Sequence, residues 1–309
     1  MANELFYPHG MKFGSTFLGQ ADDLEVDANI DELTHYAAGD YAPSFTGAKE
    51  VAPEFKLNTY DAAGVFSLVS SGNGGVDDLC RGFSSGNVDC AYRQAKNLSV
   101  PNSPATAVHY VYRLINSAMF YWDGFRVNQK GEVQVMTKTI ATLTSSNPIV
   151  TQLPNQAIDT PPLVTNLYTL GKIVIDGTAI TRLKSTNWSN NVKLEKDPAD
   201  GEASPSFCGI EQIKPVVQAD TQNLGIINAF GFSGYKITTS FDVYLRKRMA
   251  SGVNHPDAST VHIRLSATAG TVQFQSTAGG KATGKFRALL QRPSAGTKIW
   301  TITDGVAIP

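Results

Sequence analysis

Two histidines, His109 and His262, are the residues of this sequence with the clearest potential for catalysis or metal binding. Neutral imidazole is both the usual general base near pH 7 and the commonest metal ligand. Each histidine follows a valine, but neither has a carboxylate, a cysteine or a second histidine at ligand spacing. No G-x-S-x-G nucleophile motif accompanies them. We therefore expect structural histidines on the polar side of a strand, with no cofactor and no catalytic residue.

The acidic pairs and the cysteines also lack the pattern of a site. Asp22-Asp23 and Asp77-Asp78 do not form the D-x-[DN]-x-[DN]-G arrangement of a calcium loop, so we expect them to face solvent. The cysteines have no CxxC spacing and are predicted to be reduced, partly buried thiols: Cys80, Cys90 and Cys208. A hydrolase with paired carboxylates is the enzyme alternative, and it ranks last because no specific motif supports it.

Composition narrows the class of protein. The 309 residues are 42% apolar and only 17% charged, which is typical of a folded chain of about two domains. The formal charge of −1 argues against tight binding of nucleic acid, because phosphate binding needs an excess of Lys and Arg. The N-terminal segment lacks an apolar core of signal-peptide length, and no run of 18 apolar residues occurs. We expect a cytosolic chain with no membrane partner.

The chain contains an internal repeat that any functional interpretation must explain. Residues 37–59 align with residues 199–221 at an offset of 162, with eight of 23 positions identical. A second block, residues 88–110, aligns with residues 241–263 at an offset of 153. The length difference lies in the Gly-rich segment Leu68 to Asn87, which has the composition of a surface loop. The sequence therefore predicts a tandem duplication.

The elements that position these residues are predicted to be mainly antiparallel strands. Residues 235–247 alternate between apolar and polar side chains as one half-buried strand, and residues 261–277 have the pattern of a hairpin. Asp176-Gly177 supplies the positive φ angles of a tight turn within residues 170–189. Thr59 and Thr221 each precede a short apolar stretch and are predicted to be the N-caps of one short helix per copy.

The predicted organisation is two tandem homologous β-sandwich or barrel domains, each with one short helix. The first spans residues 1–147 and the second residues 167–309. Residues 148–166 are rich in proline and are predicted to form an extended linker.

The order of these parts resembles the tail tube proteins of long-tailed, non-contractile bacteriophages. The second copy carries the closer resemblance, through residues 170–180, 196–207, 213–225, 241–248 and 259–274. The resemblance implies a domain that forms rings by joining strands into an inner barrel, with the rings stacked into a tube. A duplicated subunit is then expected to form trimers with pseudo-sixfold symmetry.

The resemblance also implies partners and a location. The partners are other copies of the chain, a tape measure protein, a tail terminator and baseplate or tip proteins. Double-stranded DNA would make transient, non-specific contact inside the tube. The protein would be part of the virion tail and would be assembled in the cytoplasm of the infected host. Two alternatives remain: another phage structural protein, such as a capsid decoration or tail terminator protein, and a tandem β-sandwich protein that binds carbohydrate or a receptor.

Three groups of residues are candidates for roles in assembly. In the family, the polar loop before the repeated PSF-x-G motif reaches the next ring, which assigns ring stacking to Asp31, Glu32, Asp40, Lys196, Asp197, Asp200 and Glu202. Two roles are possible for Asp89, Arg93, Asp242 and Arg246. They form salt bridges between neighbouring strands, or they form pairs at a subunit interface or in the lumen of the tube. The motif itself is predicted to be a turn whose phenylalanine fills the core, so the structural core of the repeat comprises Phe45, Gly47, Pro53, Phe207, Gly209 and Pro215.

Overall fold

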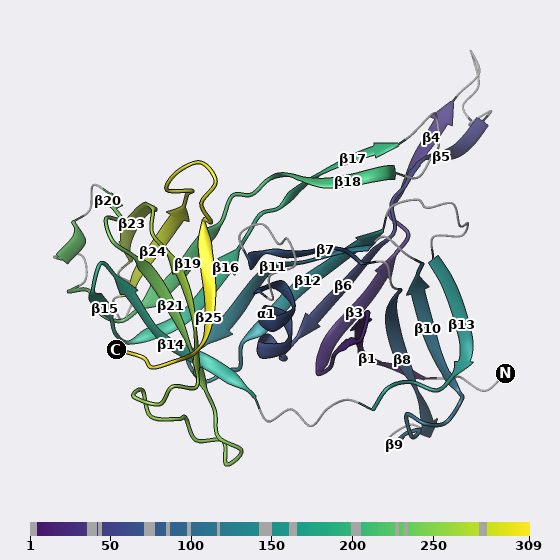
Figure 1. Ribbon diagram of the computed structural model, residues 1–309, viewed down its shortest axis with the longest axis horizontal. Coiled ribbons are helices and arrows are strands. Elements are labelled where there is room, and N and C mark those ends of the chain that lie inside the picture. The colour runs from purple at the N-terminus through teal and green to yellow at the C-terminus, as the bar shows by residue number, and fades with distance from the viewer. Residues whose placement is uncertain are drawn as a thin grey trace.

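The chain forms mostly antiparallel strands in a computed structural model (Figure 1). The structure describes residues 5–35, 42, 45–70, 78–84, 87–97, 100–115, 118–141, 150–160, 166–198, 205–225, 229–231, 234–277 and 283–309. The expected mainly β fold is confirmed, and α1 (Ala62–Ser70) is the helix of the first half.

The strands of the first half are β1 (Phe6–Phe13), β2 (Thr16–Leu18), β3 (Ala21–Asp27), β4 (Ile30–His35), β5 (Phe45–Val51), β6 (Glu54–Thr59), β7 (Cys80–Ser84), β8 (Val88–Asn97), β9 (Val100–Pro101), β10 (His109–Leu114), β11 (Ala118–Asn128), β12 (Gln134–Ala141) and β13 (Val150–Gln156). Those of the second half are β14 (Tyr168–Ile175), β15 (Thr178–Ile180), β16 (Leu183–Ser189), β17 (Lys193–Pro198), β18 (Pro205–Gln212), β19 (Val216–Thr221), β20 (Tyr235–Lys236), β21 (Phe241–Lys247), β22 (His262–Ala267), β23 (Gly270–Thr277), β24 (Thr283–Leu290) and β25 (Trp300–Val306).

One long sheet runs through both halves of the molecule. Its strands follow the order β20-β23-β24-β19-β16-β11-β12-β6-β3, with β7 paired to β11. A second sheet, β13-β10-β8-β1-β2, belongs to the first half, and a third, β15-β14-β21-β22-β25, to the second half. The hairpins β4–β5 and β17–β18 form separate two-stranded arms that project from the long sheet (Figure 1).

The two halves have matching patterns of strand pairing. The strands β1, β8, β10 and β13 pair in the same order as β14, β21, β22 and β25. In the long sheet, the pairings among β3, β6, β12, β11 and β7 correspond to those among β16, β19, β24, β23 and β20. The strands β1 and β14 differ by 162 in residue number at both ends, which is the offset of the first repeat block.

The segment predicted as one half-buried strand, residues 235–247, contains two strands instead. Residues 237–240 interrupt it between β20 and β21, and β21 is buried on both faces, with Asp242 only 7% exposed and Tyr244 5% exposed. The second face is covered because Tyr244 packs with Val174 and Ile308, near the C-terminus. Alternation along the strand predicted the core face and could not reveal this second cover.

Helix α1 begins with a different cap from the predicted one. The Gly64 N–H donates to Oδ1 of Asp61 at 3.0 Å, so Asp61 is the N-cap, while Thr59 Oγ1 accepts from the Asp61 N–H. In the second half, the Asn223 N–H likewise donates to Thr221 Oγ1, and Asn223 Oδ1 accepts from the N–H of Gly225, two residues on. The helix expected there falls partly on residues outside the described ranges.

The predicted linker is wrong for residues 150–156. They form β13, which pairs with β10 in the first-half sheet, with Leu153 opposite Val111. Its counterpart in the second half is the last strand, β25, which pairs with β22. The one proline within β13, Pro154, is tolerated because β13 is an edge strand of its sheet.

The hydrophobic core is continuous between the halves. One cluster of buried side chains includes residues from α1 and β11 in the first half and from β16, β21 and β22 in the second. The halves therefore share a core, although the sequence predicted two tandem domains joined by a linker. Within the described residues, no helix is both long enough and apolar enough to cross a membrane.

The predicted Asp176-Gly177 turn is confirmed, with φ angles of 45° and 81°. Burial opposes ionisation of Asp176, but its carboxylate accepts hydrogen bonds from the backbone N–H groups of Thr238, Ser240 and Thr239 and from the Thr238 hydroxyl. These donors hold the pKa of Asp176 well below its usual range. The carboxylate thereby anchors the segment that leads into β21.

Asp176→Asn is expected to lower the unfolding free energy at pH 7 by about 1.5–3 kcal/mol, because an amide N–H₂ would face the same donors. A depressed folded-state pKa stabilises the fold above the unfolded pKa of about 3.9, and this contribution is lost as pH falls. In urea unfolding, the difference between the two proteins should therefore stay constant from pH 7 to about pH 5 and begin to narrow below about pH 4. Asp304→Asn, at an exposed carboxylate, is the control. A difference that stays constant down to about pH 3 would contradict the role of the charge.

Candidate assembly interface

The two halves join edge to edge through β11 and β16. Phe125 lies opposite Trp188 in the antiparallel ladder, and the pairing extends to Asn128 opposite Ser185. The strand β11 has a bulge between Trp122 and Gly124. A Cβ at Gly124 would lie 2.1 Å from the carbonyl oxygen of Trp188, so the close approach of the strands requires glycine here.

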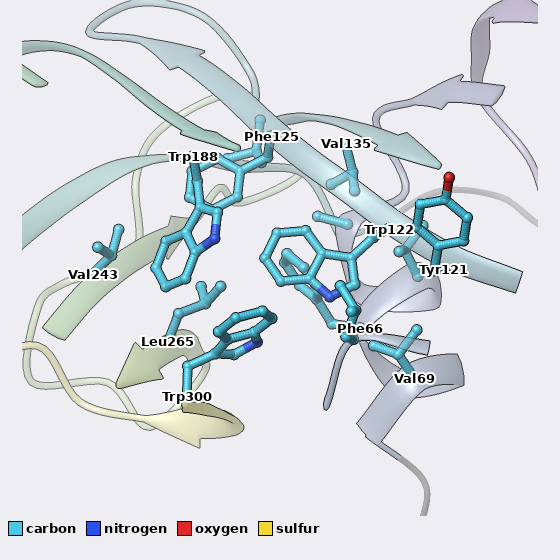
Figure 2. Packing of buried hydrophobic residues seen from close by; sticks show 14 of the residues in the cluster. Phe66, Val69, Tyr121, Trp122, Phe125, Val135, Trp188, Val243, Leu265 and Trp300 are labelled. Atoms are coloured by element: carbon cyan, nitrogen blue, oxygen red, sulfur yellow. The ribbon is translucent and has the colours of Figure 1, made fainter. Parts of the chain in front are cut away.

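Three tryptophans pack together behind this joint (Figure 2). Trp122 comes from the first half, whereas Trp188 and Trp300 come from the second. Their ring centroids lie 5.8–5.9 Å apart in all three pairs, in tilted and edge-to-face geometries. None is more than 1% exposed, and Phe66 and Phe125 pack against Trp122. The cluster therefore buries a large apolar surface between the halves.

Hydrogen bonds orient two of the three indoles. Trp188 Nε1–H donates to Asn190 Oδ1 at 2.7 Å, and the Asn190 amide donates to the Trp122 carbonyl oxygen at 2.8 Å. Trp122 Nε1–H donates to the Asp78 carbonyl at 2.9 Å. The buried Trp300 Nε1 has no hydrogen-bond partner among the described residues. Asn190 thus couples the two halves as well as satisfying Trp188.

Asp78 does not face solvent as predicted. It is 5% exposed, pairs with Lys298 and accepts a hydrogen bond from the Ile302 N–H at 3.0 Å. The Gly-rich insertion therefore does more than form a surface loop, because it supplies Asp78 and the strand β7 to this joint. Asp77 lies outside the described residues, and Asp22 and Asp23 are exposed, as expected.

The first half has an open aromatic groove where the second half has its joint. The groove has a volume of about 400 Å³ and is lined by Phe6, Val26, Tyr92, Tyr110, Tyr112 and Gln152. At offsets of 162 and 153, the first five correspond to residues of the second half that are 0–2% exposed: Tyr168, Trp188, Leu245, Ile263 and Leu265. In the second half, these five residues are covered at the joint with the first half. In the first half, nothing in the described chain covers their counterparts.

The long sheet also has an unpaired strand edge at each of its two ends. The strand β3, the counterpart of β16, pairs with β6 on one side and has no partner on the other within the described chain. At the far end, β20 pairs only with Thr271 and Val272 of β23, so residues 273–277 have no partner on that side among the described strands. Beside this edge lie Phe230 and Phe274, whose rings stack at 5.4 Å.

The predicted acidic–basic pairs make different contacts in the structure. Asp89 accepts two hydrogen bonds from Arg113 on the neighbouring strand, at 2.6 and 2.7 Å, which is the cross-strand alternative. Arg93 donates to the Asn102 carbonyl oxygen instead. In the second half, Asp242 accepts from the Ser240 hydroxyl, and Arg246 pairs with Asp257 at 2.5 Å. The four residues thus stabilise loops and sheets within the chain.

Four of the residues assigned to ring stacking lie on strands of the two arms, Asp31 and Glu32 on β4 and Lys196 and Asp197 on β17. Asp31 and Asp197 are exposed, and Lys196 is half-buried on β17. Glu32 lies on β4, but its side chain is outside the described part of the structure. Asp40, Asp200 and Glu202 lie outside the described residues.

The prediction that PSF-x-G forms a core-filling turn is wrong for the second copy. Phe207 lies within β18 and is 53% exposed. Its ring lies over Gly209, where a Cβ would come within 2.9 Å of it. Phe45 and Gly47 occupy β5, and their side-chain surroundings are outside the described part. Pro53 and Pro215, by contrast, are buried at the bases of the arms, as predicted for the repeat core.

Phe207→Ala is accordingly expected to change the unfolding free energy by less than about 1 kcal/mol, because little surface is lost from the core. Phe55→Ala, at a fully buried ring, should cost about 3–5 kcal/mol in the same chemical denaturation series. A comparable decrease in the unfolding free energy of both variants would show that Phe207 is a core residue after all.

The two histidines are fully buried and satisfied by equivalent backbone groups. His109 Nδ1 accepts from the Gln94 N–H, and its Nε2–H donates to the Ser103 carbonyl at 2.8 Å. His262 makes the same bonds with Lys247 and Pro256. The structural interpretation is therefore supported, but the predicted position on the polar side of a strand is wrong. No metal-binding group of three or more acidic, His or Cys side chains occurs within the described ranges, and all three cysteines are free and buried.

No protein-family model and no curated protein matches this chain. The candidate site therefore depends on geometry, and the sequence pointed to only part of it. The tryptophans occupy positions that do not repeat, and this asymmetry was the available signal. Residues at a joint between like halves need not be alike, because each half contributes a different side of the contact.

Proposed function

We propose that this chain arose by tandem duplication and assembles into closed rings that stack as the tube of a bacteriophage tail. Three subunits per ring would present six similar halves. The proposal draws on the resemblance to tail tube proteins, and its structural support is the head-to-tail joint between the halves. A head-to-tail contact repeats on every copy and closes if its rotation permits.

The observation that carries the proposal is that each end of the monomer lacks what the internal joint contains. One end has the free edge of β3 and the aromatic groove, which correspond to the β16 side of the joint. The other end has the free part of β23 and the stacked Phe230 and Phe274, which correspond to the β11 side. A second copy therefore fits the first without any new kind of contact.

The internal ladder also gives the register of the contact between subunits. The β23–β24 ladder aligns Phe274 with Trp122 and Gln275 with Gly124 of the β11–β12 ladder. Transferring the β11–β16 pairing then places Val26 of one subunit opposite Ser276 of the next. Pairing of this kind removes free sheet edges, which otherwise promote aggregation.

The composition suits a conduit for DNA. With a formal charge of −1, the chain has no excess of cations to hold phosphates by counterion release. Weak binding lets DNA slide along the tube during ejection into the host. The protein would act without a catalytic step, as a structural component of the virion.

Negative-stain microscopy and size-exclusion chromatography of the purified protein across a concentration series test this function. Hollow tubes of stacked rings, preceded by concentration-dependent growth in size, are the expected result. Monomers at every concentration would overturn the proposal. Monomers that bind sugar would favour the carbohydrate-binding alternative, and closed rings that never stack would favour a terminator.

A further inference from the structure

The arm of the second half packs against the first half of the same chain. Cys208, on β18, is only 1% exposed although it belongs to a two-stranded hairpin. Cys208 and Tyr121 of β11 belong to the same hydrophobic cluster, and burial raises the pKa of Tyr121. Val192, at the base of the arm, packs against the main hydrophobic cluster. In Figure 1, β17–β18 extends toward the first half alongside β7, β11 and β12, on the side of these strands away from α1.

The arm of the first half has no such cover in the described chain. Ile30, the counterpart of Val192, is 53% exposed, and Thr46, the counterpart of Cys208, is exposed. Both arms begin at an asparagine with positive φ, Asn29 and Asn191, at 46° and 45°. The two arms thus leave the sheet in the same way, but only one of them has a surface to rest on.

The surface equivalent to the one under β17–β18 is open in the second half. Gln273 corresponds to Tyr121, and Arg287 corresponds to Lys138, according to the ladders of the long sheet. Both line a groove of about 620 Å³ on the outer face of that sheet, together with Gln218, Gln275 and Lys285. The groove is polar. Two exposed cations line it, Lys285 and Arg287, and make no ion pair within the described residues, beside one acidic residue, Asp220, which accepts a hydrogen bond from the Ser185 hydroxyl.

The charge of the first arm suits this groove. Within residues 30–51, acidic residues outnumber basic ones: Asp31, Glu32, Asp40 and Glu50 against Lys49. The corresponding contact inside the chain is more apolar, with Leu194, Cys208 and Ile210 on the arm and Tyr121 beneath it. Each arm therefore complements the surface assigned to it: the second arm and the sheet beneath it are both apolar, and the first arm is acidic where the groove has an excess of cations.

We propose that the β4–β5 arm of each subunit lies in this groove on the second half of the adjacent subunit in the same ring. The inference rests on the proposed function, because only a head-to-tail ring brings the arm to the groove. It adds a second contact to each subunit joint, beside the paired edges, and it places the described part of the arm against the same ring.

Disulfide trapping tests the contact in the assembled protein. Thr46→Cys combined with Gln273→Cys places cysteines at the positions equivalent to Cys208 and Tyr121. Oxidised rings of this variant should shift from single chains to a ladder of covalent multimers on non-reducing gels, reversed by a thiol reductant. Thr46→Cys with Ser251→Cys, whose second site lies on the exposed loop between β21 and β22, is the matched control and should stay as single chains.

Hydrogen exchange of the unmodified protein supplies a second measurement. Assembly should slow amide exchange in β4 and β5 relative to the monomer. Rings that form without the specific cross-link and without this protection would overturn the arm contact and leave the proposed ring intact. Failure of every variant and of the parent to assemble would overturn both.

Discussion

Val26→Glu is expected to abolish ring assembly while leaving the subunit folded. Val26 lines the open aromatic groove and is the counterpart of Trp188, which is fully buried at the internal joint. In the monomer, a carboxylate at this position would reach solvent through the groove. In the proposed ring it would be buried at the subunit contact opposite Ser276, without a cationic partner, at a cost of several kcal/mol. The concentration needed for half-assembly should rise by about a thousandfold or more.

Light scattering against concentration, with circular dichroism to monitor folding, measures this effect. Val253→Glu adds the same charge at a valine that is 62% exposed on a loop, and it should assemble like the parent protein. Assembly of Val26→Glu at the parent's concentration would show that the groove is not buried between subunits. Unfolding of the isolated variant would instead show that Val26 belongs to the monomer core.

Trp122→Ala is expected to lower the unfolding free energy by about 3–5 kcal/mol. The indole contacts both other tryptophans and Phe66, so its removal leaves a cavity that rigid strands on both sides cannot fill. Because the cluster joins the halves, its loss should destabilise both halves together. Chemical denaturation followed by tryptophan fluorescence and by circular dichroism should report the same single transition.

Two gentler variants separate packing from hydrogen bonding in this cluster. Trp188→Phe removes the N–H that Asn190 accepts and leaves a buried oxygen unpaired, which should add about 1–3 kcal/mol to the cost of the smaller ring. Trp300→Phe removes an N–H for which the described structure offers no partner. The Trp188 variant should therefore be the less stable of the two. An equal or greater loss for Trp300→Phe would contradict this assignment of the hydrogen bonds.

The local pattern of the sequence was sufficient to predict the type of structure. Alternating side chains indicated strands, Asp176-Gly177 indicated a tight turn, and the repeat offsets of 162 and 153 match the numbering of paired strands in the two halves. These features depend on neighbours in the chain or on one face of a strand. Backbone geometry and the period of two are enough to specify them.

The sequence was not sufficient wherever burial depends on a distant segment. Asp78, predicted to face solvent, is buried by Lys298 and the strand that follows it, more than 200 residues later. Phe207, predicted to fill the core, is exposed because its segment extends as an arm. In each case the residue type fitted the prediction, but the tertiary neighbours decided the outcome.

By itself, therefore, the sequence determined a β-rich chain of two like halves without a recognisable catalytic motif. Only the tertiary structure decided that the halves share one long sheet and one core and join through β11 and β16. The physical reason is that a repeated sequence specifies equivalent strands in both halves, whereas the joint pairs two strands that are not equivalent, β11 and β16. The three tryptophans, at positions that do not repeat, became an interface only once β11 and β16 were paired.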